Sequence, residues 1–78
     1  MTEYRPVDCA LHSEYELAIM RRRSLHLSWH GRDALMHIEV VQPTDLFTRH
    51  GEKFLVVRRA GGRLEEIRLD RILAHRDA

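Results

Sequence analysis

The segment from Phe54 to Ile72, FLVVRRAGGRLEEIRLDRI, places the strongest constraint on the fold of this chain. Residues that favour β-structure run from Phe54 to Ala60, and the alternation of apolar and polar residues resumes from Arg63 to Leu69. Between these two runs stands Gly61-Gly62, a glycine pair typical of tight hairpin turns. The segment therefore predicts a β-hairpin.

The register of this hairpin follows if the glycine pair forms the whole loop. Asp70 interrupts the second strand before a short apolar run, residues 71–73, so we expect a sharp bend into another strand. A hairpin that bends in this way is typical of small barrels. The expected cross-strand pairs on one face are Val56 with Ile67, Phe54 with Leu69, and Arg58 with Glu65.

Length and composition favour a binding domain over an enzyme. The 78 residues make one domain, and a chain of this size buries only about 60% of its unfolded surface, which leaves little room for a sequestered catalytic site. The 13 basic and 12 acidic residues nearly cancel, so net charge alone favours neither nucleic acid nor membrane as a partner. We expect no catalytic residues, no cofactor and no bound metal.

Cysteine content and hydropathy indicate the compartment. Cys9 is the only cysteine, which excludes an intramolecular disulfide and favours a reducing environment. No apolar run approaches the roughly 18 residues of a membrane span, and the N-terminal MTEYRP lacks the apolar core of a signal peptide. We therefore expect a cytoplasmic monomer without a membrane partner.

The N-terminal part predicts an extended arm over residues 1–7 and a helix over residues 8–22. The helix could begin at Ser13, which forms a capping-box pattern with Glu16, or earlier, with Asp8 as the cap. Either start gives the helix one apolar face for packing. The expected apolar stripe consists of Tyr15, Ala18 and Ile19, joined by Leu11 if the helix begins early.

A further hairpin is expected after the helix. Residues 24–30 alternate between apolar and polar, Gly31-Arg32 can supply a tight turn, and residues 34–41 resume as a strand. This turn would set His26 opposite His37 on the outer face, where a metal site with His30 is conceivable and solvated histidines are the simpler interpretation. The expected inner pairs are Leu25 with Ile38, Leu27 with Met36, and Trp29 with Ala34.

The next segment is expected to leave the sheet. Pro43 cannot donate to a β-ladder, so residues 42–45 should end the strand, with a turn or a single helical turn through Leu46-Phe47. Residues 48–53, TRHGEK, are polar and predict an exposed loop.

With residues 24–75 as strands and turns, the chain predicts a mainly β fold with one N-terminal helix. The expected architecture is a small open barrel of about five antiparallel strands. Sm-like and OB-like barrels both fit this description, and a helix ahead of all the strands favours the Sm-like order.

Several short segments resemble the Rof family of Rho-specific inhibitors of transcription termination. The similarity lies in the order and spacing of residues between positions 4 and 73, and no single piece is a catalytic motif. The residues that carry the resemblance are Tyr4, Pro6, Asp8, Cys9, Glu16-Leu17-Ala18, Asp45-Leu46, Leu55-Val56-Val57, Arg68-Leu69-Asp70 and Ile72.

This resemblance implies a small Sm-like barrel that binds the N-terminal RNA-binding domain of the Rho hexamer and keeps RNA from loading. In the family, the contacts come from the helix region and from the loop before the third strand. Acidic groups contribute because the RNA site that they face is basic. Glu14, the first acidic residue after Cys9, joins this set, although the acidic residues could instead complement the positive end of the helix. The nominated partner-binding residues are Asp8, Glu14, Glu16, Thr48, Arg49, His50 and Gly51.

Direct RNA binding by an Sm-like module is the alternative function. It would use a phosphate-binding patch of arginines, which could equally be solvated charge near the helix C-terminus. The arginines concerned are Arg21, Arg22, Arg23, Arg58, Arg59 and Arg63.

Overall fold

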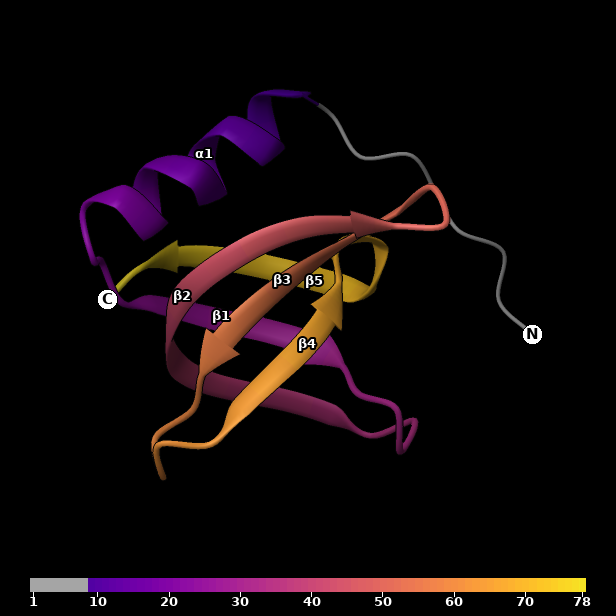
Figure 1. Ribbon diagram of the computed structural model, residues 1–78. Helices are drawn as coiled ribbons and strands as arrows, with labels where there is room; N and C mark the ends of the chain where they lie inside the picture. The colour runs from indigo at the N-terminus through magenta and orange to yellow at the C-terminus, as the bar shows by residue number, and fades with distance from the viewer. Residues whose placement is uncertain (1–8) are drawn as a thin grey trace.

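The computed structural model describes residues 9–78, which form one helix and five strands (Figure 1). The strands make an antiparallel sheet in the order β4-β3-β2-β1-β5, which bends without closing. The predicted fold class, mainly β with one helix and a small open barrel, is confirmed. The elements are α1 (Cys9–Met20), β1 (Leu25–His30), β2 (Met36–Arg49), β3 (Glu52–Arg58), β4 (Leu64–Arg68), the 3₁₀ turn η1 (Leu69–Arg71) and β5 (Ile72–Asp77).

Helix α1 follows the earlier of the two predicted starts. It begins at Cys9, so Ser13 lies inside the helix and the predicted capping box of Ser13 with Glu16 is wrong. The alternative cap, Asp8, and the predicted arm over residues 1–7 lie outside the described residues. Within residues 9–78, no helix has the length and apolar character that crossing a membrane requires.

The apolar stripe of α1 packs on the sheet as predicted. Tyr15 and Ala18 are buried, and Leu11 and Ile19 lie against the same core. Burying one large apolar side chain stabilises a fold by roughly 1.5–3 kcal/mol, so this stripe holds the helix in place. The largest fully buried side chains in the described part of the chain are Trp29, Tyr15, Leu27, Leu55, Val41, Val57 and Pro43.

The C-terminus of α1 is a Schellman-type turn. The Arg23 N–H donates to the Ala18 carbonyl over 2.9 Å, and the Arg22 N–H donates to the Ile19 carbonyl over 3.2 Å. Arg22 adopts a left-handed φ of 53°, the conformation this turn requires after the last helical residues. The turn directs the chain into β1.

The β1–β2 hairpin differs from the prediction because its loop is longer. The Gly31 N–H donates to the Leu35 carbonyl over 2.9 Å, and Ala34 takes a left-handed φ of 63°. The loop therefore spans residues 31–35, and Trp29 pairs with His37. The predicted inner pairs of β1 with β2 are wrong, because the register is displaced by an odd number of residues.

This displacement exchanges the two faces of the first half of β2. His37 and Glu39 now lie on the inner face, although both are polar. His26 pairs with Val40, so the predicted facing pair of His26 and His37 does not form. The apolar residues that the exchange leaves exposed are Met36, Ile38 and Val40.

The β3–β4 hairpin exists as predicted, but its register is shifted by one residue. The Gly62 N–H donates to the Arg59 carbonyl over 2.8 Å, and Gly62 takes a left-handed φ of 85°. The loop thus comprises Ala60, Gly61 and Gly62, the three-residue hairpin type that places glycine in the left-handed position. The predicted pairs are wrong, and the structure pairs Phe54 with Arg68, Leu55 with Ile67, Val56 with Glu66, Val57 with Glu65, and Arg58 with Leu64.

Strand β2 does not stop at Pro43 as predicted. A β-bulge between Pro43 and Asp45 accommodates the proline, and the strand continues to Arg49. The predicted exposed loop over residues 48–53 is instead a tight turn at His50-Gly51, with φ values of 50° and 78°. Because β2 pairs with β1 in its first half and with β3 in its second, it bends the sheet into a barrel (Figure 1).

Candidate functional site

The helix N-terminal half and the β2–β3 hairpin lie side by side at one end of the barrel. The Lys53 Nζ lies 3.3 Å from the His12 Nδ1, and the His12 Nε2 lies 3.0 Å from the Glu16 Oε1. A neutral His12 with its proton on Nε2 satisfies both contacts, because it accepts from the ammonium and donates to the carboxylate. These contacts link Glu16 to the hairpin through His12.

Thr48 extends this surface along the hairpin. It pairs with Lys53 across the two strands, and the turn His50-Gly51 forms the exposed tip. We define the helix–hairpin surface as the described residues of the His12–Lys53 contact and the adjoining helix and hairpin tip: His12, Glu16, Thr48, His50, Gly51 and Lys53.

Arg49 lies on the opposite face of the same hairpin. Its guanidinium stands 5.0 Å from the Phe47 ring centroid and 5.6 Å from that of Phe54, and the two rings stack at 5.2 Å. The Arg49 Nη1 also lies 3.5 Å from the Glu66 Oε1. Arg49 therefore adjoins the helix–hairpin surface only at the turn, and its packing on aromatic rings gives it a structural role as well.

Glu14 is separated from Glu16 and points to the other side of α1. Its Oε2 lies 2.9 Å from the His75 Nε2 on β5, and the Tyr15 hydroxyl lies 3.2 Å from the His75 Nδ1. Burial, followed by the nearby Glu14 charge, raises the pKa of the Tyr15 hydroxyl, so the hydroxyl stays protonated and can donate to His75. Glu14 thus ties the helix to β5, and the structure does not group it with the other nominated residues. Asp8 lies outside the described residues.

The opposite end of the barrel holds a polar cluster that the sequence did not predict. Trp29 is fully buried there, with His37 stacked on it at 5.2 Å between ring centroids and the Arg59 guanidinium 5.6 Å from its ring. We call this cluster the open-end network, and its members are Trp29, Asp33, His37, Glu39, Arg59 and Glu65.

Arg59 is the centre of the open-end network. Its Nε donates to Glu39 Oε1 over 3.1 Å, its Nη2 donates to Glu39 Oε2, and its Nη1 donates to Glu65 Oε1 over 2.8 Å. The hydrogen bond from Arg59 lowers the pKa of Glu39, and the same bond to Glu39 raises the pKa of Arg59. The three side chains keep between 21% and 27% of their surface exposed.

Asp33 and His37 form the other half of this network. The His37 Nε2 lies 3.2 Å from both carboxylate oxygens of Asp33, and the Leu35 N–H donates to Asp33 Oδ1 over 3.0 Å. This backbone hydrogen bond, followed by the bond with His37, lowers the pKa of Asp33. Gly31 makes the arrangement possible, because a Cβ there would lie 2.8 Å from both Asp33 Oδ1 and His37 Nε2.

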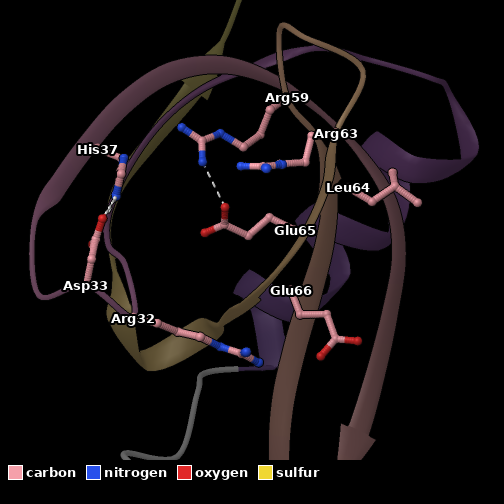
Figure 2. Close-up of a pocket in the computed structure, with 8 residues that line it drawn as sticks. All are labelled: Arg32, Asp33, His37, Arg59, Arg63, Leu64, Glu65 and Glu66. Carbon is pink, nitrogen blue, oxygen red and sulfur yellow. Dashed lines mark hydrogen bonds and ion pairs between the residues drawn. The ribbon is translucent and has the colours of Figure 1, made fainter.

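A cavity of about 620 Å³ opens over the network, and Arg32 and Arg63 reach toward it from opposite sides (Figure 2). Its carboxylates are engaged: Asp33 contacts His37, Glu65 contacts Arg59, and Glu66 contacts Arg49. Arg32 and Arg63 form no ion pair with residues 9–78. Within that same range, no cluster of three histidine, cysteine or acidic side chains could hold a metal. The charged side chains around this cavity can recognise a ligand by its charge.

Sequence alternation could not reveal the open-end network. In MHIEVV, residues 36–41, the apolar positions suggest an inner face made by Met36 and Ile38, whereas the structure turns His37 and Glu39 inward. The one usable signal was AGG at residues 60–62, which also fits a three-residue loop and would have placed Arg59 rather than Arg58 on the inner face.

Comparisons with known proteins do not identify a family. The chain matches no model of a protein family, and no curated protein has a similar sequence.

Proposed function

We propose that this chain binds the N-terminal RNA-binding domain of transcription termination factor Rho and inhibits Rho-dependent termination by blocking RNA loading. The inhibitor acts stoichiometrically, through a protein–protein interface, and without catalysis. The proposal comes from the resemblance to the Rof family, and one structural observation supports it.

That observation is the adjacency of α1 and the β2–β3 hairpin. The Lys53–His12 contact joins residues that lie 41 positions apart in the sequence, and the His12–Glu16 contact extends this surface along α1. The Glu16 side chain keeps 55% of its surface exposed while it accepts from His12, so its carboxylate remains open to a basic partner. An RNA-binding site on Rho would present such basic groups.

The interface that we propose is the helix–hairpin surface, with Arg49 at its border. Glu14 contributes less in this arrangement, since it faces β5 and is engaged by His75. Charge complementarity of this kind fixes orientation and speeds association more than it adds affinity. Replacing Glu16 should therefore reduce the association rate with Rho.

The test is a binding measurement with the Rho hexamer, paired with a transcription assay on a Rho-dependent terminator. Glu16→Lys should weaken binding by about tenfold, a loss of roughly 1.4 kcal/mol. Asp77→Lys is the matched control: Asp77 is also an exposed carboxylate in an ion pair, with Arg23 at 3.4 Å, but it lies on β5. The control should bind as the unchanged chain does.

The possible outcomes separate the function from the site. Absence of binding to Rho by the unchanged chain would end the proposed function. Binding that Glu16→Lys and Arg49→Glu both leave unchanged would remove the helix–hairpin surface as the interface. Binding that fails to displace labelled RNA from Rho would contradict the blocking mechanism.

Direct RNA binding is a second candidate, because Arg22 and Arg58 line one shallow hollow beside Pro43. Of the other arginines considered, Arg59 is held by Glu39 and Glu65, and Arg23 contacts Asp77. The candidate predicts RNA affinity that falls steeply with salt. Fluorescence anisotropy that detects no RNA binding at about 50 mM salt would exclude it, and Arg58→Gln should weaken any binding that is seen.

A further inference from the structure

We propose that the pocket between β4 and the β1–β2 loop binds a phosphate group, either inorganic or carried by a small molecule. The groups that would hold it are the Arg71 and Arg32 guanidinium groups, and the buried indole of Trp29 lies beside them in the pocket wall. This inference does not depend on the proposed binding to Rho, because none of these residues belongs to the helix–hairpin surface.

Two residues that line this pocket each have a buried donor without an acceptor. Among the described residues, the buried side-chain nitrogens that lack a hydrogen-bond partner are Trp29 Nε1 and Arg71 Nε. Buried N–H groups are almost always paired, because an unmade hydrogen bond in the interior is costly. Trp29 pairs with Ile72, which follows Arg71 in the sequence. Trp29 and Arg71 both line one pocket of about 230 Å³. The wall of this pocket therefore contains two residues with a buried nitrogen that lacks a partner, and one of them, Arg71, carries a charge.

The balance of charge in this pocket favours an anion. Its carboxylates, Glu65 and Glu66, are already paired with Arg59 and Arg49, and its Arg68 is paired with Asp70 at 2.7 Å. The remaining lining cations, Arg32 and Arg71, form no ion pair with any residue that the structure describes. Two uncompensated guanidinium groups thus match a dianion.

Phosphate fits this arrangement better than a carboxylate does. Its oxygens can accept from several donors in different directions, and guanidinium groups bind phosphate through paired N–H bonds. A cavity of about 230 Å³ accommodates one such group. The pocket shares Arg32, Glu65 and Glu66 with the larger cavity of about 620 Å³, so a substituent on the phosphate has a path outward.

Trp29 provides a direct readout, because it is the only tryptophan in the chain and gives a single indole N–H signal in heteronuclear NMR. Titration with inorganic phosphate, against sodium chloride at equal ionic strength, should move this signal along a saturable curve. Ribose 5-phosphate should bind in the same way if the natural ligand is a phosphate monoester. Acetate tests whether a carboxylate is preferred.

Arg71→Gln and Arg32→Gln should each weaken phosphate binding by about tenfold. Arg76→Gln is the matched control, since Arg76 is an exposed arginine on β5 that lines a different hollow. Arg32 is exposed in the β1–β2 loop, so its replacement tests the site even if Arg71→Gln unfolds the chain. A linear, unsaturable shift, an equal effect of chloride or acetate, or no change in both site variants would overturn the proposal.

Discussion

The helix-covered end and the open end of the barrel differ in the side chains that line them. At the helix-covered end, Tyr15 and Ala18 bury apolar surface against the sheet, and the polar contacts lie around the rim. At the open end, Arg59 links Glu39 and Glu65 above the buried Trp29, so charged groups occupy positions that an apolar core would otherwise fill. The first end stabilises the fold by apolar burial, and the second includes Arg32 and Arg71, which form no ion pair with the residues that the structure describes and on which the phosphate proposal rests.

This difference has an energetic basis. Apolar burial is non-directional and roughly proportional to area, so the helix end tolerates small adjustments. Half-buried ion pairs are directional, and removing one partner leaves a charge that is poorly solvated. The two ends should therefore respond differently to substitution.

The largest expected effect is at the helix-covered end. Tyr15→Ala should lower the free energy of unfolding by about 3–5 kcal/mol, because it removes a large buried side chain from the core. Urea unfolding followed by circular dichroism measures this loss. Tyr15→Phe keeps the ring and removes only the hydroxyl bonded to His75, so it should cost about 1 kcal/mol. Equal losses in the two variants would show that the hydroxyl, and not apolar burial, secures the helix.

At the open end, Arg59→Met should lower the free energy of unfolding by about 2–3 kcal/mol, because Glu39 and Glu65 lose their shared partner. Arg58→Met is the matched control one residue away. Arg58 is exposed on the outer face of β3, so its replacement should change stability by less than about 0.5 kcal/mol. The opposite ranking would favour the register predicted from the sequence, in which Arg58 meets Glu65.

The ionisation of Glu39 should make the free energy of unfolding depend on pH. Arg59 lowers the pKa of Glu39 in the folded state below its unfolded value near 4.5, so its contribution is complete above that value and is lost as the pH falls. Glu39→Gln should therefore destabilise the protein at pH 6 by about 1–2 kcal/mol, with a smaller difference at pH 3. Urea unfolding of both proteins at the two pH values checks the sign. A difference that grows on acidification would contradict the assigned ion pair.

The two ends also differ in how well their structure could be predicted from the sequence. The apolar stripe of α1, the strand count and both hairpins follow from local patterns, and the structure bears them out. The registers do not follow, because they depend on loops that the patterns leave ambiguous: residues 31–35 and residues 60–62. A shift by an odd number of residues reverses both faces of a strand, so each misjudged loop misplaced an entire set of side chains.

The candidate sites show the same division. Of the nominated residues, Glu16 contacts His12 and Thr48 pairs with Lys53, so both lie beside the His12–Lys53 contact, whereas Glu14 faces His75 on β5. The open-end network could not be predicted, since His37 and Glu39 turn inward against the alternation of their own strand. Only tertiary pairing with Trp29 and Arg59 makes that orientation favourable.

The smallest expected effect tests the exchanged faces of β2. Ile38 is 70% exposed, so Ile38→Thr should change the free energy of unfolding by less than about 0.5 kcal/mol. Val41 is 1% exposed on the same strand. Val41→Thr should lower the free energy of unfolding by about 1–3 kcal/mol, because it places a hydroxyl group in the apolar core. Urea unfolding of this matched pair decides between the registers. If Ile38→Thr proves the more damaging, Ile38 faces the core, and the inward placement of His37 and Glu39 must be abandoned together with the open-end network built on it.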